Sequence, residues 1–303
     1  MKISPAQVIK ERIESGQALL IVLLGMAVVL TLVLSIVSRS VTDVSITKKD
    51  EDSLRAFSAA EAGIEQMLVG GPTTSEFPES NSSFTGSVTD IGGQNYYNMV
   101  NNYASGEVGL VWFVSHDTNG NIKCDGQNPC INPSGKSLNM CWGTNLGSTP
   151  AIEISLFYDT TRKALTSDFS DVKIARATFD SNASRRNENF FGQASETNCT
   201  FTIGPTYRFT SGYKSFLTDL GLPAGCNQEG CLLFARIKIF YNSAPDGIGV
   251  ALDSGTFPAQ AIKVTSSGFS GEATRKVEAI QTFDEFLQIF DNAVFSNSGD
   301  LSK

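Results

Sequence analysis

Histidine is almost absent from this sequence, and cysteine is absent from its first 123 residues. The one histidine, His116, leaves too few imidazole ligands for the Cys and His sets that bind structural zinc. It would also have to serve any Ser-His-Asp arrangement, and no serine lies in a G-x-S-x-G motif. We therefore expect that the protein is not an enzyme.

Basic side chains are a minority. Lys and Arg number 23 against 31 Asp and Glu, which gives a formal net charge of -8. A nucleic-acid-binding surface needs an excess of basic side chains to neutralise phosphates. We expect no nucleic-acid partner.

Six cysteines are concentrated in the middle of the chain, downstream of a long apolar segment. An even number in this position is typical of disulfides formed in an oxidising compartment. Six cysteines allow fifteen pairings, so the sequence does not fix the connectivity. Free or metal-bound thiols are the alternative, and the irregular spacing fits no zinc pattern. We favour the local bridges Cys124–Cys130 and Cys226–Cys231, which leave Cys141 with Cys199.

No charge occurs in the 21 positions of residues 17–37, which read QALLIVLLGMAVVLTLVLSIV. At about 1.5 Å per residue, a helix of this length spans about 30 Å, the thickness of a bilayer core. A secretory signal peptide has a shorter apolar region and a small-x-small cleavage site after it. The slight basic excess of residues 1–16 favours a cytoplasmic leader, although Arg39, Lys48 and Lys49 weaken that argument. We predict a single-pass membrane protein.

The helical pattern continues beyond the apolar segment. No Gly or Pro interrupts residues 38–68, and apolar residues recur there at the three- and four-residue spacing of an amphipathic helix. Gly70, Gly71 and Pro72 then form a stop signal. We predict one helix over residues 17–70, with residues 17–37 in the membrane. The apolar positions of its later part are Leu54, Phe57, Ala60, Ile64 and Met67.

The leader ending at Gly16, the uninterrupted apolar helix and the segment RAFSAAEAGIEQML (residues 55–68) resemble type IV prepilins. The chain is most similar to PilX-type minor pilins, in the AAEAG segment at Ala59–Gly63 and in IKVTSSGFSGEATRKVEA at residues 262–279. The resemblance implies cleavage by prepilin peptidase between Gly16 and Gln17, with N-methylation of Gln17. It also implies residence in the inner membrane before assembly, and then a cell-surface pilus held together by contacts between pilin helices.

One position departs from the family pattern. Most major pilins place Glu at the fifth mature position, which is Ile21 here. In those filaments the carboxylate is thought to meet a neighbour's N-terminal amine in an apolar core, where an unpaired charge is costly. The resemblance therefore implies a minor pilin at the tip or in the initiating complex, acting in pilus assembly with adhesion as a further role. The alternatives are a type II secretion pseudopilin and a single-pass anchored surface protein that does not polymerise.

Residues 71–303 predict a β-rich extracytoplasmic domain. Residues 71–106 are rich in Ser, Asn, Gly and Thr and favour loop with short elements. The predicted class is α+β, a long N-terminal helix packed on an antiparallel β-sheet domain with disulfides. Alternating or apolar patterns predict strands at Val108–Ser115, Ala151–Asp159, Asp171–Phe179, Leu232–Tyr241, Ala261–Ser267 and Ala273–Thr282. The tail opens with the helix-spaced residues Phe286, Ile289 and Phe290.

The segment DTNGNIKCD carries oxygen side chains at spacings that suit a calcium ion, with the Lys123 carbonyl as a further ligand. It departs from an EF-hand, because the Gly at position 6 and the Glu at position 12 are missing. The alternative, which the sequence favours, is a turn in which Asp and Asn side chains bond the backbone. The candidate ligands are Asp117, Asn119, Asn121 and Asp125.

Overall fold

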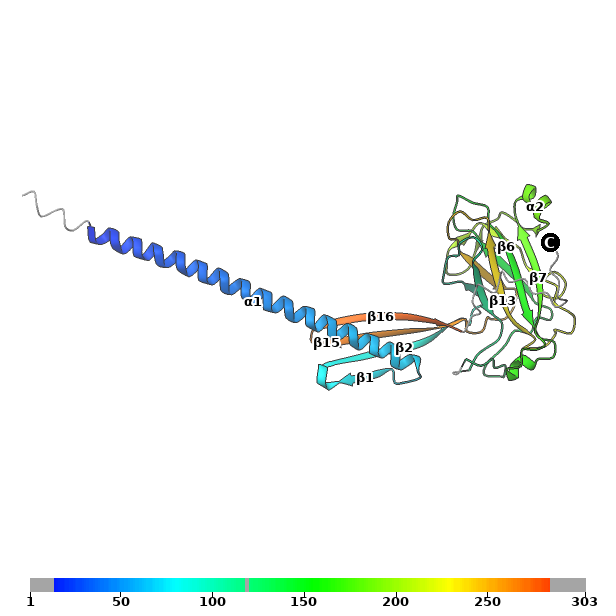
Figure 1. The fold of residues 1–303 in the computed structure, drawn as a ribbon, viewed down its shortest axis with the longest axis horizontal. Helices are drawn as coiled ribbons and strands as arrows, with labels where there is room; N and C mark the ends of the chain where they lie inside the picture. Colours follow the sequence, from blue (N-terminus) through cyan, green and yellow to red (C-terminus); the bar gives the residue numbers. More distant parts are fainter. Residues whose placement is uncertain (1–13, 118–119, 284–303) are drawn as a thin grey trace, which may run out of the picture. The chain divides into compact units, whose positions relative to one another are not determined.

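A single long helix begins the described part of the chain. The computed structural model describes residues 14–117 and 120–283. Helix α1 (Glu14–Leu68) is 55 residues long (Figure 1). It ends where the stop signal predicts. Gly70 has a φ of 76°, and its backbone N–H donates to the Met67 carbonyl oxygen at 3.2 Å.

The chain divides into two compact units. The first, here the helix unit, contains the described residues up to Ser87 together with Thr265–Val277. The second, here the β-rich unit, contains Val88–Val264 and the described residues from Glu278 onward. Residues 71–303, taken from the sequence as one β-rich region, are therefore shared between the two units.

In the helix unit, the end of α1 packs on a four-stranded sheet with the order β1-β2-β15-β16 (Figure 1). Ala60, Ile64 and Met67 are buried there, which confirms the amphipathic prediction at these positions. Leu54 and Phe57, which have the same helical spacing, are exposed at 68% and 43%. The sheet consists of β1 (Thr74–Phe77), β2 (Ser82–Ile91), β15 (Ala261–Ser270) and β16 (Ala273–Thr282). Residues 88–91, 261–264 and 278–282 of these strands are assigned to the β-rich unit.

The β-rich unit is built from two larger sheets that share one core. The first has the order β4-β13-β6-β7-β8 and is antiparallel except for the parallel β7–β8 pair. The second has the order β11-β5-β14-β3, and β12 also pairs with β5. Apolar residues from both sheets form a single cluster that includes Ile154, Ile237, Met140 and Val250. Burial of these side chains is the main stabilising contribution to the unit.

The elements of the first sheet are β4 (Val108–Trp112), β6 (Ala151–Tyr158), β7 (Lys173–Asp180), β8 (Gly192–Gln193) and β13 (Leu232–Phe240). Those of the second are β3 (Tyr96–Asn98), β5 (Ser137–Trp142), β11 (Phe209–Thr210), β12 (Lys214–Ser215) and β14 (Ile248–Leu252). The unit also contains a small ladder of β9 (Cys199–Thr200) with β10 (Thr206–Tyr207), the short helix α2 (Ala183–Asn189) and a 3-10 turn (Lys163–Thr166). A further 3-10 turn (Pro78–Ser80) connects β1 and β2.

The α+β class is confirmed, as are the six predicted strands with small differences at their ends. Residues 71–106 hold more strand than expected, because β2 runs for ten residues with Phe84 as its one fully buried side chain. Strands β5 and β14 were also missed. The predicted apolar start of the tail, at Phe286, Ile289 and Phe290, lies outside the described residues.

Candidate functional site

The apolar part of α1 is uncovered. The large apolar side chains from Leu19 to Val37 have exposed fractions between 51% and 70%. Among the described residues, α1 is the one helix long and apolar enough to cross a membrane. Exposed apolar surface on this scale is unfavourable in water and must be covered by lipid or by other helices. The described chain offers this segment no cover of its own.

The expected processing site lies at the start of this helix. Gly16 and Gln17 fall within the first turn of α1, which begins at Glu14. Ile21 lies one turn further on, with its side chain 66% exposed. The apolar surface thus extends from this turn without a break in the helix.

The other end of α1 is held close to its sheet by small residues. Ala56, Ala59 and Ala60 are buried. A Cβ atom on Gly63 would come within 2.7 Å of the Phe84 ring, so only glycine fits against β2 there. Within the AAEAG segment, Ala59, Ala60 and Gly63 therefore lie on the face of the helix that contacts the sheet.

All three favoured disulfides are present. They join Cys124 to Cys130, Cys141 to Cys199, and Cys226 to Cys231, and no cysteine is free. All of them lie in the β-rich unit. The Cys141–Cys199 bridge closes the longest loop, with a sequence separation of 58.

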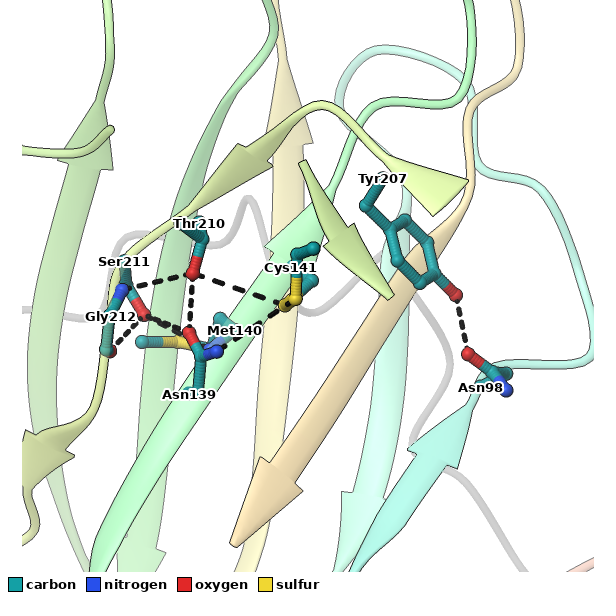
Figure 2. Close-up of a disulfide and its surroundings, with 9 residues drawn as sticks. Asn98, Asn139, Met140, Cys141, Tyr207, Thr210, Ser211 and Gly212 are labelled. Atoms are coloured by element: carbon teal, nitrogen blue, oxygen red, sulfur yellow. Dashed lines mark hydrogen bonds between the residues drawn. A yellow bond between two sulfur atoms is a disulfide. The ribbon is translucent and has the colours of Figure 1, made fainter. Parts of the chain in front are cut away.

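Hydrogen bonds hold the strand that carries Cys141 to the chain beside it (Figure 2). The Asn139 side-chain carbonyl accepts a hydrogen bond from the Thr210 hydroxyl at 2.6 Å. The Ser211 hydroxyl accepts another from the backbone N–H of Met140 at 3.0 Å. These bonds hold β5 against β11 and the residue that follows it, next to the Cys141–Cys199 bridge. They also give the polar groups involved hydrogen-bond partners.

A second buried polar contact lies near this bridge (Figure 2). The Tyr207 hydroxyl donates to the side-chain oxygen of Asn98 at 2.9 Å. Burial raises the pKa of Tyr207 well above that of an exposed phenol, so this hydroxyl stays protonated and keeps its donor.

In the candidate calcium loop, the carboxylates of two described residues accept hydrogen bonds from backbone N–H groups of their own turns, as in the favoured turn interpretation. Asp117 Oδ1 accepts from the backbone N–H of Asn121 at 2.9 Å, and Asp125 Oδ1 accepts from that of Asn128 at 2.8 Å. Hydrogen bonds from Asn128 lower the pKa of Asp125 to about 2. Asn119 lies outside the described residues. Among those that are described, no group of three or more His, Cys, Asp or Glu side chains could hold a metal ion, and calcium binding here stays a prediction.

His116 lies among aromatic rings. Its ring stacks on Phe283, with 4.0 Å between the centroids, and meets the edge of Trp112 at 4.5 Å. Burial lowers the pKa of His116 to about 4, although the nearby Asp117 carboxylate acts in the opposite direction. The imidazole is therefore neutral at neutral pH. No local signal in the sequence relates His116 to Phe283, since 167 positions separate them.

Comparison with models of protein families, with curated proteins and with solved structures found no match for this chain.

Proposed function

We propose that this protein is a prepilin-like structural subunit that assembles through its N-terminal helix, as a minor pilin of a type IV pilus. The observation that carries the proposal is the contrast between the two parts of α1. Its first part presents an unbroken apolar surface, whereas its last turns are fixed to a sheet. One helix can then anchor the chain to an apolar phase while holding a folded unit outside it.

The energetics suit a helix that moves between two apolar surroundings. Burial of one large aliphatic side chain contributes about 1.5–3 kcal/mol relative to water, so the whole segment strongly resists exposure to water. A bilayer and a bundle of apolar helices cover it equally well, and packing between the helices then decides the association. A subunit stored in the membrane can therefore enter a filament without exposing the segment.

The packing of the helix end supports the same function. Small residues bring α1 and β15 into backbone contact, and the Arg275 guanidinium donates to the Ser53 hydroxyl at 2.9 Å. A load on the helix is thus passed to the sheet through several contacts. This suits a subunit whose attachment in an assembly depends on its helix.

Leader processing and filament association together test the proposal. The gene should be expressed in a host with a type IV pilus system, and the N-terminus of the membrane and sheared-filament fractions determined by mass spectrometry. We expect a mature chain that starts at methylated Gln17 and is present in the filament fraction. An intact leader in both fractions would favour the anchored protein that does not polymerise. A processed chain found only with a secretion pseudopilus would favour the pseudopilin.

A further inference from the structure

Three aromatic residues form a row across neighbouring strands of the first sheet of the β-rich unit. Phe234 of β13 pairs with Trp112 of β4 on one side and with Phe157 of β6 on the other. The ring centroids are 5.0 Å apart in the first pair and 4.3 Å apart in the second, where the rings are stacked. Val111, the neighbour of Trp112 in β4, belongs to the main core. The aromatic row therefore lies on the opposite face of the sheet.

The aromatic row lines a pocket, here the aromatic pocket. Its volume is about 460 Å³, which is within the usual range of small-molecule sites. His116, Phe169 and Phe283 also contribute to its lining. Phe169 is 54% exposed, whereas Trp112 and Phe234 are only 9% and 6% exposed. The pocket thus extends from the surface of the unit to buried rings.

The lining of the aromatic pocket carries no formal charge. Among the described residues, no Lys, Arg, Asp or Glu side chain lines it, and its remaining members are glycine, asparagine, serine and aliphatic residues. Burial lowers the pKa of His116 to about 4, so the imidazole is also uncharged at neutral pH. A charged ligand would lose its hydration here without gaining an ion pair. The pocket therefore favours an uncharged ligand.

Two lining residues carry buried nitrogen atoms without a partner. Nε1 of Trp112 and Nδ1 of His116 form no hydrogen bond within the described part of the chain. The other tryptophan differs, because Nε1 of Trp142 donates to the Pro150 carbonyl oxygen at 2.8 Å. A buried indole N–H normally has an acceptor. A ligand with a carbonyl oxygen would provide one for Trp112.

A small molecule suits this lining better than a peptide segment does. Each peptide group brings an N–H and a C=O, and both need partners when they are buried. The lining offers mainly rings and aliphatic side chains, with few polar groups. A flat aromatic molecule instead gains from offset or edge-on contacts with aromatic rings.

We propose that the aromatic pocket binds a small, uncharged, planar aromatic molecule that carries a carbonyl oxygen. The ligand packs on the aromatic row, and its oxygen accepts a hydrogen bond from the indole N–H of Trp112. Binding of this kind does not depend on filament assembly, and it adds a ligand-binding role to the proposed structural one.

Isotope labelling of the tryptophan indole nitrogens, followed by NMR of the full-length chain in lipid nanodiscs with its disulfides intact, tests the proposal. Coumarin is the probe, because it is flat and uncharged and carries a carbonyl oxygen. The chain contains two tryptophans, so the spectrum has two indole signals. Coumarin should move the Trp112 signal downfield in a saturable way. It should leave the Trp142 signal in place, because that N–H already has an acceptor.

A coumarin that carries a carboxylate tests the requirement for an uncharged ligand. It keeps the ring and the carbonyl oxygen but should bind about tenfold more weakly or worse, because its charge finds no partner in the lining. Binding as tight as that of coumarin would overturn the assignment to an uncharged ligand.

Two matched variants separate the aromatic pocket from binding elsewhere. Phe169→Ala removes a partly exposed ring of the lining and should weaken coumarin binding about fivefold to tenfold. Phe190→Ala removes a ring that is 88% exposed and does not line the pocket, so the affinity should stay unchanged. Equal effects of the two variants would place coumarin elsewhere and overturn the proposal. A Trp112 signal that stays in place up to the solubility limit of coumarin would also overturn it.

Discussion

A Cβ atom placed on Gly268 would lie 2.5 Å from the backbone nitrogen of Ala60, well inside van der Waals contact. Strand β15 therefore touches the backbone of α1 directly, without side chains between them. The AAEAG segment and the glycine-containing hairpin, on which the expected resemblance to PilX-type minor pilins rests, meet at this point. Close packing thus explains the small residues in both segments of this chain.

Gly268→Ala should destabilise the helix unit by about 1–3 kcal/mol, the usual cost of overpacking a tight contact. The atoms in the way belong to the helix backbone and cannot rotate aside. Hydrogen exchange of residues 53–68 in the full-length chain measures the effect. We expect faster exchange there and little change in the β-rich unit.

Gly126→Ala is the control for that experiment. No atom lies within 4 Å of a Cβ at Gly126, so the methyl group enters open space. Its effect on either unit should be within about 0.5 kcal/mol, as for ordinary surface changes. Equal effects of the two variants would contradict the close-packing argument.

Much of the fold could be predicted from local pattern. The long helix and its stop at Gly70 followed from an uninterrupted apolar run and a glycine signal. Strand β13 was predicted from the alternation of its side chains along the sequence, and Ala235, Ile237 and Ile239 on one of its faces are indeed buried. Strand β2 was missed because most of its side chains are polar or exposed, which removes the period-2 signal.

The remaining misses share a different cause. Strand β14 is short and contains Gly249, where the Tyr207 and Phe201 rings lie too close for a Cβ atom. That need for glycine arises from residues more than forty positions away. The pocket around His116 likewise joins β4, β13 and Phe283. Contacts between segments far apart in the sequence produce no periodic pattern in either segment, so they could not be predicted from local sequence.

Under the proposed pilin function, Gly16→Val should block removal of the leader, because the peptidase implied by the resemblance requires the smallest side chain before the cut. Gly25→Val is the matched control in the same helix. A Cβ at Gly25 meets no atom within 4 Å, so we expect normal processing of that variant. Intact-mass measurement of membrane-extracted protein distinguishes the chain that keeps its leader from the chain that has lost it. Equal processing of both variants would show that cleavage does not occur after Gly16.

Removing the Cys141–Cys199 bridge should cost more stability than removing the Cys226–Cys231 bridge. In the chain-entropy account, cross-links with separations of 58 and 5 contribute about 4 and about 2 kcal/mol respectively. Paired Cys→Ala variants of the full-length chain, unfolded in denaturant, measure the difference. A larger loss from the shorter bridge would show that local packing outweighs loop closure.

Lowering the pH from about 6.5 to about 4 should destabilise the β-rich unit through His116. Burial holds its folded-state pKa near 4, below the ordinary 6.5, so the unfolded chain binds the proton more tightly. The stabilising contribution is complete above pH 6.5 and is lost as the pH falls toward 4. His116→Phe keeps an aromatic ring between Trp112 and Phe283 but does not titrate. Denaturant midpoints between pH 7 and pH 5 should fall less in this variant, since the sequence has no other histidine.

Under the proposed pilin function, Ile21 predicts that this chain is a minor component of its filament. Burying an aliphatic side chain there contributes about 1.5–3 kcal/mol and needs no charged partner. A filament built mainly of this chain would leave each Gln17 ammonium without a carboxylate, at a cost of several kcal/mol per subunit in an apolar core.

Quantitative proteomics of sheared filaments should therefore find this chain at low stoichiometry. Ile21→Leu keeps the apolar side chain and should leave the amount unchanged. Ile21→Glu should lower it, because an acidic side chain on a subunit at the growing end meets no ammonium from above and stays unpaired. If the chain proved to be the dominant component, the interpretation of Ile21 would be wrong. The pilin proposal itself would stand, because it rests on the exposed apolar helix and not on this one position.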